Sequence, residues 1–390
     1  MILSNYRPIA LVSPCSKLLK IIILDFLECH LHTCDNQFGF KRNHAADMCI
    51  FALKNVIDYY KKWGSAVYSC FLDASKAFDR VNHWTLFLKM KERGMPSIII
   101  RLLLFWYRHQ TVFVQWGCHI SQGFTVTNGV RQGSVLSPKL FALYVDDLSV
   151  LLCKSNVGCM IDNVCFNHLF YADDLCVLAP SPAALQQLLN ICYQYGLNND
   201  IMYNPTKSVC VVFKTSKYKL NCPLVYLGNM AVPYQSNVRY LGVLFTSGCS
   251  DNAEIQRQTH ILYARSNTVL RKFSACSLPV KLSLFQSFCT SFYCSQLWCS
   301  YSVQVYKKMN AAYNNAYRFL LGFGKMCSAS HILTCNNIVT FDSLLRRNVF
   351  TFKMRLQMAQ NTLVQSLMNN LTVHNSAMFR KWNSSLYTCV

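Results

Sequence analysis

Two adjacent aspartates, Asp173 and Asp174, lie between two apolar stretches within the run 163–180. Because both stretches read as strands, the two acids are expected at the bend of a β-hairpin. Carboxylates in such apolar surroundings are costly unless cations neutralise them. Clustered carboxylate oxygens are the ligands that Mg²⁺ and Mn²⁺ prefer. The pair alone does not decide the matter, since neighbouring acids are more often solvated surface residues.

A third acid, Asp73, falls at the end of residues 66–72, which read as a buried strand. Acids contributed by two strands can hold two divalent ions roughly 3.5–4 Å apart, an arrangement that serves in-line displacement at phosphorus. One ion would lower the pKa of an attacking hydroxyl and the other would neutralise phosphate oxygens. Taken alone, an Asp after a strand more commonly caps the next helix, so that alternative stays open.

Several motifs follow one another over residues 5–245, and their order is more specific than any one of them. The segments are Asn5–Leu11 with Ser16–Leu19, Gln37–Arg42, Phe71–Asp79, Asn128–Pro138, Tyr171–Asp174, Asn204–Ser208 and Val238–Phe245. In type and order they resemble the reverse transcriptases of non-LTR (LINE-like) retrotransposons. The resemblance implies an α+β right-hand polymerase fold with fingers, an antiparallel-sheet palm and a helical thumb.

The resemblance also implies roles for the acids. Asp73, Asp173 and Asp174 would be catalytic and would hold two Mg²⁺ or Mn²⁺ ions, with the backbone carbonyl of Ala74 near one of them. Phe78 stands where the family places a ring that crowds a ribose 2′-hydroxyl, which would favour deoxynucleotides. Ordinary core packing is the alternative interpretation of Phe78.

Other segments would contact nucleotide and primer. Gln132 and Gly133 would line the nucleotide pocket, and the glycine would let the backbone approach the incoming pair. Basic side chains suit phosphate oxygens, although a solvated lysine is an equally good interpretation of Lys207. The expected triphosphate contacts are Arg7, Lys17 and Lys207, and the expected primer grip is Arg239 and Tyr240.

A second acidic pair, Asp146 and Asp147, lies in a segment that resembles the retroviral form of the metal motif. Apolar residues recur there every four positions, the spacing of one helix face: Leu136, Leu140, Tyr144, Leu148 and Leu152. We therefore predict a helix over residues 136–153 that carries this pair as a solvated feature.

Composition favours a nucleic-acid partner. Lys and Arg number 38 against 17 Asp and Glu, a formal charge of +21, which predicts salt-dependent phosphate binding with little sequence preference. Aromatic residues make up 13% of the chain and offer surfaces on which bases can stack. A basic but passive protein is the alternative.

Cysteine usage indicates a reducing compartment, the nucleus or the cytoplasm. The 21 cysteines are an odd number at scattered positions, unlike a secreted disulfide scaffold. No secretory signal is expected, because the first motif begins at once, and no apolar run is long enough to span a membrane. Two trios, Cys29/His32/Cys34 and Cys327/His331/Cys335, lack the four ligands of a structural zinc site.

Four regions are expected along the chain. Residues 1–64 would form N-terminally truncated fingers, 65–249 the palm with fingers insertions and primer grip, 250–320 the thumb, and 321–390 a helical extension. Helices are predicted over 18–31, 46–60, 83–107, 183–195, 254–273 and 306–321, with a hairpin formed by 112–116 and 123–127.

Three departures from the family pattern bear on function. By the resemblance, an endonuclease usually precedes the polymerase; we expect this sequence to lack it and to lack the N-terminal part of the fingers. Asn43 stands where the family usually has Gly, and Ala45 and Ala46 where hydroxyls are usual.

The expected function is an RNA-directed DNA polymerase acting on an RNA template, a DNA primer and dNTP, with no stable protein partner inferable. The alternative is an inactive retroelement relic that binds nucleic acid.

Overall fold

The computed structural model describes residues 9–214, 222–324 and 326–387. Its chain divides into two compact units, which are described separately below. The first unit comprises residues 1–49, 67–210 and 220–234. The second comprises residues 50–66, 211–219 and 235–390.

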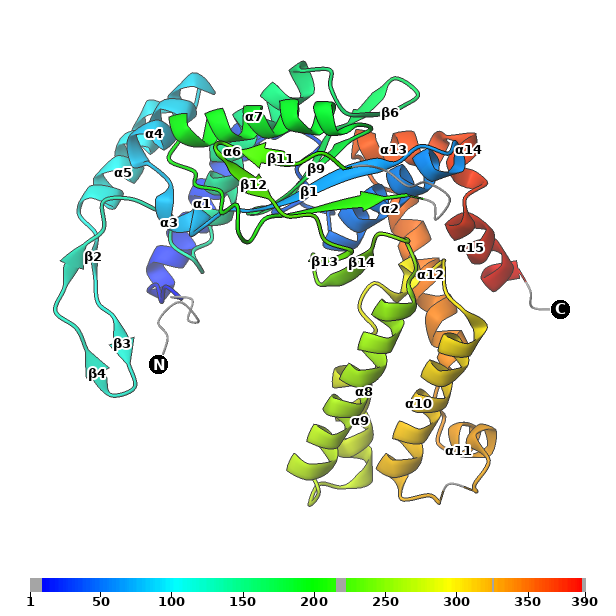
Figure 1. The fold of residues 1–390 in the computed structure, drawn as a ribbon. Coiled ribbons are helices and arrows are strands. Elements are labelled where there is room, and N and C mark those ends of the chain that lie inside the picture. The colour runs from blue at the N-terminus through cyan, green and yellow to red at the C-terminus, as the bar shows by residue number, and fades with distance from the viewer. Residues whose placement is uncertain (1–8, 215–221, 325, 388–390) are drawn as a thin grey trace. The chain divides into compact units, whose positions relative to one another are not determined.

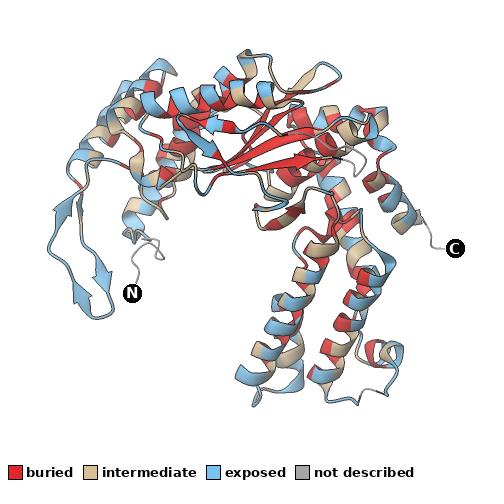
Figure 2. Cartoon of the chain, in the orientation of Figure 1, coloured by how far each residue is buried: buried red, intermediate tan, exposed pale blue. Residues whose placement is uncertain are grey.

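A four-stranded sheet has the order β10 (Val209–Phe213), β1 (Val67–Asp73), β9 (Asp174–Ala179), β8 (His168–Tyr171). Its strands β1, β9 and β8 form the centre of the first unit, whereas β10 is divided between the units at residue 210. β9 runs antiparallel to both β1 and β8. Six of the seven β1 residues and five of the six β9 residues are buried, and each strand exposes only the aspartate at one end. Figure 2 shows these strands almost entirely in the colour of buried residues. The sheet is therefore a core element whose acidic residues lie together at one edge.

Helices surround this sheet within the first unit. α7 contacts β1 and β9, and α6 packs on α7 and on α4, so that α7 lies across one face of the sheet (Figure 1). The helices are α1 (Pro14–Leu27), η2 (Glu28–His30), α3 (Ala77–Arg80), α4 (His83–Glu92), α5 (Ser97–Arg108), α6 (Ser137–Lys154) and α7 (Pro182–Asn198). Side chains that accept backbone N–H groups begin several of them, as Asn82 does for α4 and Ser181 for α7.

Short hairpins complete the first unit. β2 (Thr111–Val112) pairs with β5 (Phe124–Thr125), and β3 (Gln115–Trp116) pairs with β4 (His119–Ile120), which together form one long ribbon. The hairpin predicted over 112–127 is thus confirmed. Two further antiparallel pairs are β6 (Cys159–Ile161) with β7 (Val164–Phe166) and β11 (Val225–Leu227) with β12 (Met230–Val232).

The second unit is mainly helical. It contains most of α2 (Ala46–Lys62) and the hairpin β13 (Asn237–Tyr240) with β14 (Val243–Thr246). Its other helices are α8 (Asn252–Lys272), α9 (Leu278–Phe288), η3 (Ser295–Leu297), α10 (Val303–Leu321), α11 (Ala329–Cys335), α12 (Phe341–Gln357), α13 (Thr362–Asn369), α14 (Leu371–His374) and α15 (Ala377–Tyr387).

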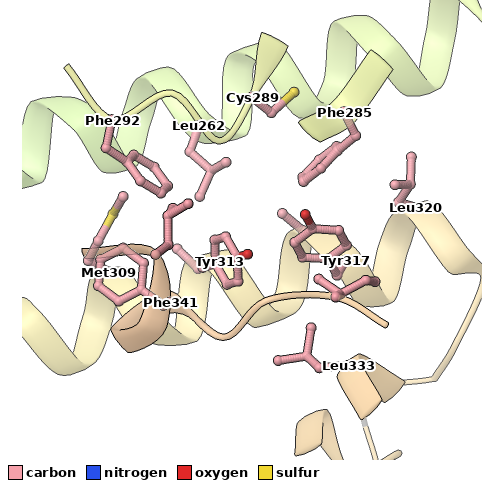
Figure 3. Packing of buried hydrophobic residues seen from close by; sticks show 14 of the residues in the cluster. Leu262, Phe285, Cys289, Phe292, Met309, Tyr313, Tyr317, Leu320, Leu333 and Phe341 are labelled. Atoms are coloured by element: carbon pink, nitrogen blue, oxygen red, sulfur yellow. The ribbon is translucent and has the colours of Figure 1, made fainter. Parts of the chain in front are cut away.

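An aromatic core holds α8, α9 and α10 together. Figure 3 shows Phe285 and Phe292 meeting Tyr313 and Tyr317, with Leu262 of α8 filling the space beside them. Tyr313 and Tyr317 lie one helical turn apart on α10, so they present one apolar face. The start of α8 is fixed to α2 by a buried ion pair in which Lys54 Nζ lies 2.5 Å from Asp251 Oδ1.

The mixed α+β class with antiparallel sheets is confirmed. Helices occur at every predicted position, but the one predicted over 83–107 is interrupted at residues 93–96 and forms α4 and α5. α6 covers the predicted helix 136–153, and α8 and α10 cover the predictions over 254–273 and 306–321. Among the described residues, no helix combines the length and apolar character needed to cross a membrane.

Candidate active site

Asp73 and Asp174 are direct partners in the register of β1 and β9. Residues directly opposite each other in an antiparallel pair have Cα atoms about 4.5–5.5 Å apart and point to the same face. Tyr171 also pairs with Asp174, which leaves Ala172 and Asp173 as a two-residue loop. Acids separated by a hundred positions are thus brought to one edge of the sheet, where Asp73 and Asp174 are exposed and Asp173 is half-buried.

The donor chemistry of this edge suits a hard divalent cation, because it consists of carboxylate and backbone oxygens. The three carboxylates are not gathered as ligands, however. Within residues 9–214, 222–324 and 326–387, no three His, Cys, Asp or Glu side chains lie close enough to hold a metal ion. Neither cysteine–histidine trio forms such a group.

The turn over residues 204–208 is fastened to Asp73. The N–H of Asn204 donates to the carbonyl of Asp73 at 2.8 Å, and the N–H of Asp73 donates to Ser208 Oγ at 3.1 Å. Ser208 Oγ also donates to the carbonyl of Asn204, and Asn204 Oδ1 accepts the N–H of Lys207. The exposed Lys207 therefore lies in a turn whose backbone is tied to the first aspartate.

The segment 36–39 lies along the free edge of β8. The N–H of Phe38 donates to the carbonyl of Phe170, and the N–H of Phe170 donates to the carbonyl of Asn36, both at 2.8 Å. Gly39 then meets the acidic loop so closely that a Cβ built on it would lie 2.4 Å from the backbone nitrogen of Ala172. The second sequence motif therefore supports the loop that carries Asp173.

Ala172 itself has a φ of +59°, a conformation that residues with a Cβ seldom adopt. Such strain persists only where the surrounding structure holds it, and it gathers at functional sites. The contact with Gly39 and the pairing of Tyr171 with Asp174 supply that restraint.

Phe78 lies in an aromatic group. Its half-buried ring stacks on Phe141 of α6, with centroids 4.5 Å apart and planes at 13°, and meets the edge of Phe40 at 6.1 Å. The packing alternative from the sequence therefore accounts for part of its environment. One ring can both pack and present an edge, so its predicted role in sugar selection stays a prediction.

The segment that carries Gln132 and Gly133 is hydrogen-bonded to the residues around Phe78. The N–H of Val130 donates to the carbonyl of Phe78 at 2.7 Å, and Gln132 Nε2 donates to Asp79 Oδ1 at 3.4 Å. Gly133 has a φ of +97°, and a Cβ there would approach the carbonyl oxygen of Ala10 to 3.2 Å. The glycine is therefore needed for backbone geometry, whatever it binds.

The predicted basic contacts have varied positions. Arg7 lies outside the described residues, and Lys17 is exposed on α1. Arg239 and Tyr240 belong to β13 of the second unit, where Arg239 is exposed. Tyr240 is 3% exposed, with its ring near Phe245.

The solvated interpretation of Asp146 is wrong. Asp146 lies on α6 as predicted, but it is 4% exposed and its Oδ1 accepts the N–H of Cys34 and Nε2 of Gln37. Its Oδ2 lies 2.5 Å from a guanidinium nitrogen of Arg93. α6 is buried on more than one side, and the apolar residues that recur every four positions mark only one of these sides. The periodicity therefore predicted an exposed position for Asp146. Asp147 is half-buried and pairs with Lys89 at 2.7 Å.

Sequence reasoning also missed several supporting residues. Gly39 is one of them, because nothing in a single sequence tells which glycine supports a distant loop. Asn43, a departure from the family glycine, has a φ of +60°, and Asn is among the residues that best tolerate that region. Lys41 donates to the carbonyls of Thr33 and Cys34, so this motif cation serves the local fold.

Comparison with known proteins agrees with this geometry. Residues 3–245 match the family described as "Reverse transcriptase (RNA-dependent DNA polymerase)". The probable RNA-directed DNA polymerase from transposon X-element of Drosophila melanogaster is 28% identical over 82% of this chain and 36% of its own length. The RNA-directed DNA polymerase from mobile element jockey of Drosophila funebris is 26% identical, over 72% of this chain and 31% of its own. The probable polymerase from transposon BS of Drosophila melanogaster is 25% identical, over 93% and 41%.

The chain therefore spans about a third to two-fifths of the length of these relatives. Among solved structures, apo telomerase from Candida tropicalis is 12% identical, with a TM-score of 0.47 over 95% of this chain and 59% of that one. The match to the family covers more than half of the chain and includes every described acid and motif at the sheet edge. The chain belongs to the reverse transcriptase family of RNA-directed DNA polymerases and is related to those of the non-LTR retrotransposons.

Proposed function

We propose that this chain extends a DNA primer on an RNA template, with the primer 3′-hydroxyl attacking the α-phosphate of a dNTP and pyrophosphate leaving. The observation that carries the proposal is the direct pairing of Asp73 with Asp174 beside the loop that holds Asp173. Three carboxylates at one sheet edge, in a chain of net charge +21, are a local anionic site on a cationic protein. That contrast suits a site for divalent cations beside a polyanion.

The acids would do the central chemistry. Two Mg²⁺ or Mn²⁺ ions held by Asp73, Asp173, Asp174 and the Ala74 carbonyl would activate the primer hydroxyl and neutralise charge on the transferred phosphate. Asp73 and Asp174 are exposed, and in the proposed mechanism their side chains would turn between staggered rotamers toward a common centre. The backbone bonds from Asn204 and to Ser208 hold Asp73 in place while its side chain turns.

The remaining predicted contacts complete this proposal. Phe78 would exclude the ribose 2′-hydroxyl, and Gln132 with Gly133 would line the nucleotide pocket. Arg7, Lys17 and Lys207 would contact the triphosphate, and Arg239 with Tyr240 would grip the primer. The proposed regions stay those expected from the sequence: fingers over 1–64, palm with primer grip over 65–249, thumb over 250–320 and a helical extension over 321–390. The nucleus or cytoplasm is the proposed compartment, where the free thiols of the described cysteines would persist.

A primer-extension assay on poly-rA with an oligo-dT primer and Mg²⁺ tests the proposal. Incorporation of dTTP is expected, and Asp173→Ala is expected to lower it by about a hundredfold or more, as loss of a main electrostatic group does. Asp25→Ala, which removes an exposed carboxylate on α1, is the matched control and should keep normal activity. Equal incorporation by both variants would refute the assignment of the site.

A second candidate is a nucleic-acid-binding protein without catalysis. The observation that favours it is that the described acids are not gathered as metal ligands. RNA binding that falls with salt, equal in wild type and Asp173→Ala, together with no incorporation under any divalent cation, would establish this alternative.

A further inference from the structure

A cavity of about 300 Å³ lies in the second unit, away in sequence from every acid of the proposed polymerase site. Three elements line it: the segment before α10 with the first turn of that helix, the N-terminal half of α12, and α15. Its volume falls within the range of small-molecule pockets in proteins. The residues that matter for its chemistry are Trp298, Tyr301, Tyr306, Asp342, Arg346 and Lys381.

Aromatic rings form one wall of this cavity. Tyr301 and Tyr306 are half-buried and stack on each other, with ring centroids 5.5 Å apart and planes at 14°. Trp298 is 5% exposed, and its indole Nε1 is buried without a hydrogen-bond partner in the described part of the chain. A buried indole N–H without an acceptor is costly. The wall therefore combines flat ring surface with an unsatisfied donor in the tryptophan that lines it.

Cations lie at the rim of the same cavity. Lys381 Nζ lies 4.9 Å from the ring centroid of Tyr301, and Arg346 lines the cavity from α12. The single lining carboxylate, Asp342, accepts the hydroxyl hydrogen bond of Tyr306. Burial, followed by the proximity of Asp342, raises the pKa of Tyr306, which keeps this phenol protonated as a donor. The cavity lining therefore carries two cationic side chains and one carboxylate.

We propose that this cavity binds one nucleotide, with its base against the tyrosine rings and its phosphate on Lys381 and Arg346. Aromatic side chains bind bases of any sequence by stacking, and a guanidinium pairs well with phosphate oxygens. A purely apolar ligand would make no contact suited to the exposed Lys381, and a bare anion would make no contact suited to the rings. The nucleotide is either a free mononucleotide or one held within a single-stranded RNA.

This site is distinct from the nucleotide pocket of the proposed polymerase. Every residue that lines it belongs to the second unit, whereas the paired aspartates and Phe78 belong to the first. Binding here needs neither divalent cations nor catalysis. The test below is therefore independent of whether the chain polymerises DNA.

Equilibrium binding of fluorescent GMP and of a short single-stranded RNA, both without divalent cations, tests the proposal. Lys381→Gln is expected to weaken binding about tenfold, the cost of one charge-assisted contact. Tyr301→Ala is expected to weaken it about fivefold or more, and Tyr301→Phe, which keeps the ring, should bind as wild type does. Arg380→Gln is the matched control, because Arg380 is an exposed neighbour on α15 that does not line the cavity.

The two probes separate the two sources of nucleotide. If Lys381→Gln weakens GMP binding alone, the site takes free mononucleotides; if it weakens RNA binding, alone or with GMP, the site holds a nucleotide of a strand. If Lys381→Gln weakens neither probe more than Arg380→Gln does, the proposal is overturned. Lys381 is exposed, so this variant decides the question even if Tyr301→Ala proves unstable.

Discussion

The acidic loop formed by Ala172 and Asp173 depends directly on the absence of a side chain at Gly39. A Cβ there would press on the backbone nitrogen of Ala172, an atom that cannot move aside as a flexible side chain does. We predict that Gly39→Ala lowers the free energy of unfolding by about 1–3 kcal/mol, the usual cost of overpacking. It should also reduce primer extension, because the loop carries Asp173.

Urea unfolding and primer extension of the same preparation check this prediction. Gly248→Ala is the matched control, since Gly248 has open space where a Cβ would lie and a φ outside the left-handed region. We expect that control to change stability by less than about 0.5 kcal/mol. If both alanine variants change stability and primer extension to the same extent, the close approach of Gly39 to Ala172 matters for neither folding nor activity.

Substitution of the single residue Phe78 tests whether its ring selects the sugar of the nucleotide. We predict that Phe78→Ala lowers the preference for dNTP over rNTP by about 10–200-fold, because removing apolar bulk opens space for one extra hydroxyl. Competing incorporation of dTTP and UTP measures the ratio. Phe40→Ala removes the neighbouring ring that Phe78 meets edge-on and should leave the ratio unchanged. An unaltered ratio in Phe78→Ala would limit this residue to packing against Phe141.

The Cys34 thiol has an unusual acidity. Cys153 lies 3.7 Å away, sulfur to sulfur, and its hydrogen bond lowers the pKa of Cys34 to about 7, against the opposing effect of burial. We predict that iodoacetamide alkylates Cys34 with a midpoint near that pH, because the thiolate is the reactive form. In Cys153→Ala the donor is gone, so the midpoint should move to higher pH.

Mass spectrometry of the peptide that contains Cys34, across a pH series, follows this reaction. Cys165→Ala removes another half-buried thiol and should leave the midpoint unchanged. A Cys34 profile that Cys153→Ala does not move would mean that the hydrogen bond between the two sulfurs does not set the acidity.

At the scale of elements, Asp146 joins α6 to the segment 32–37. Its carboxylate accepts from the N–H of Cys34 and from Gln37, and it pairs with Arg93, which also donates to the carbonyl of His32. We predict that Asp146→Ala lowers the free energy of unfolding by about 3–5 kcal/mol, because it leaves a partly buried guanidinium uncompensated. Thermal and urea unfolding measure the loss. Asp25→Ala should stay within about 0.5 kcal/mol, and an equal effect of the two variants would contradict this role.

The sequence predicted elements better than it predicted their contacts. The strand ending at Asp73, the acidic hairpin and α6 follow from local patterns of apolar and polar residues, which act over a few positions. The resemblance led us to expect that Asp73 and Asp174 lie near each other, but their direct pairing was not predicted, since no local pattern encodes a register between strands a hundred residues apart. The burial of Asp146 was not predicted because its partners lie in the segment 32–37 and at Arg93, directly after α4. Contacts of this kind depend on tertiary packing.

At the scale of the whole molecule, the charge of +21 predicts how the proposed RNA binding depends on salt. Each phosphate that a basic side chain neutralises releases counterions, so affinity falls as salt rises. If six to ten phosphates are contacted, we predict a loss of about 10³–10⁵ in affinity between roughly 50 and 200 mM salt. Fluorescence anisotropy with labelled RNAs of two unrelated sequences measures it. Affinity that is flat with salt, or that differs greatly between the sequences, would argue against backbone binding.

The strand order of the central sheet has a consequence for synthesis on the ribosome. β1 lies between β10 and β9, and both of these partners follow it by a hundred residues or more. At about 5–20 residues per second, roughly five to twenty seconds pass between translation of β1 and arrival of its first neighbour. During that interval an apolar segment with unpaired amides is open to association with other nascent chains. We therefore expect β1 to be a segment that chaperones bind while the chain is being made.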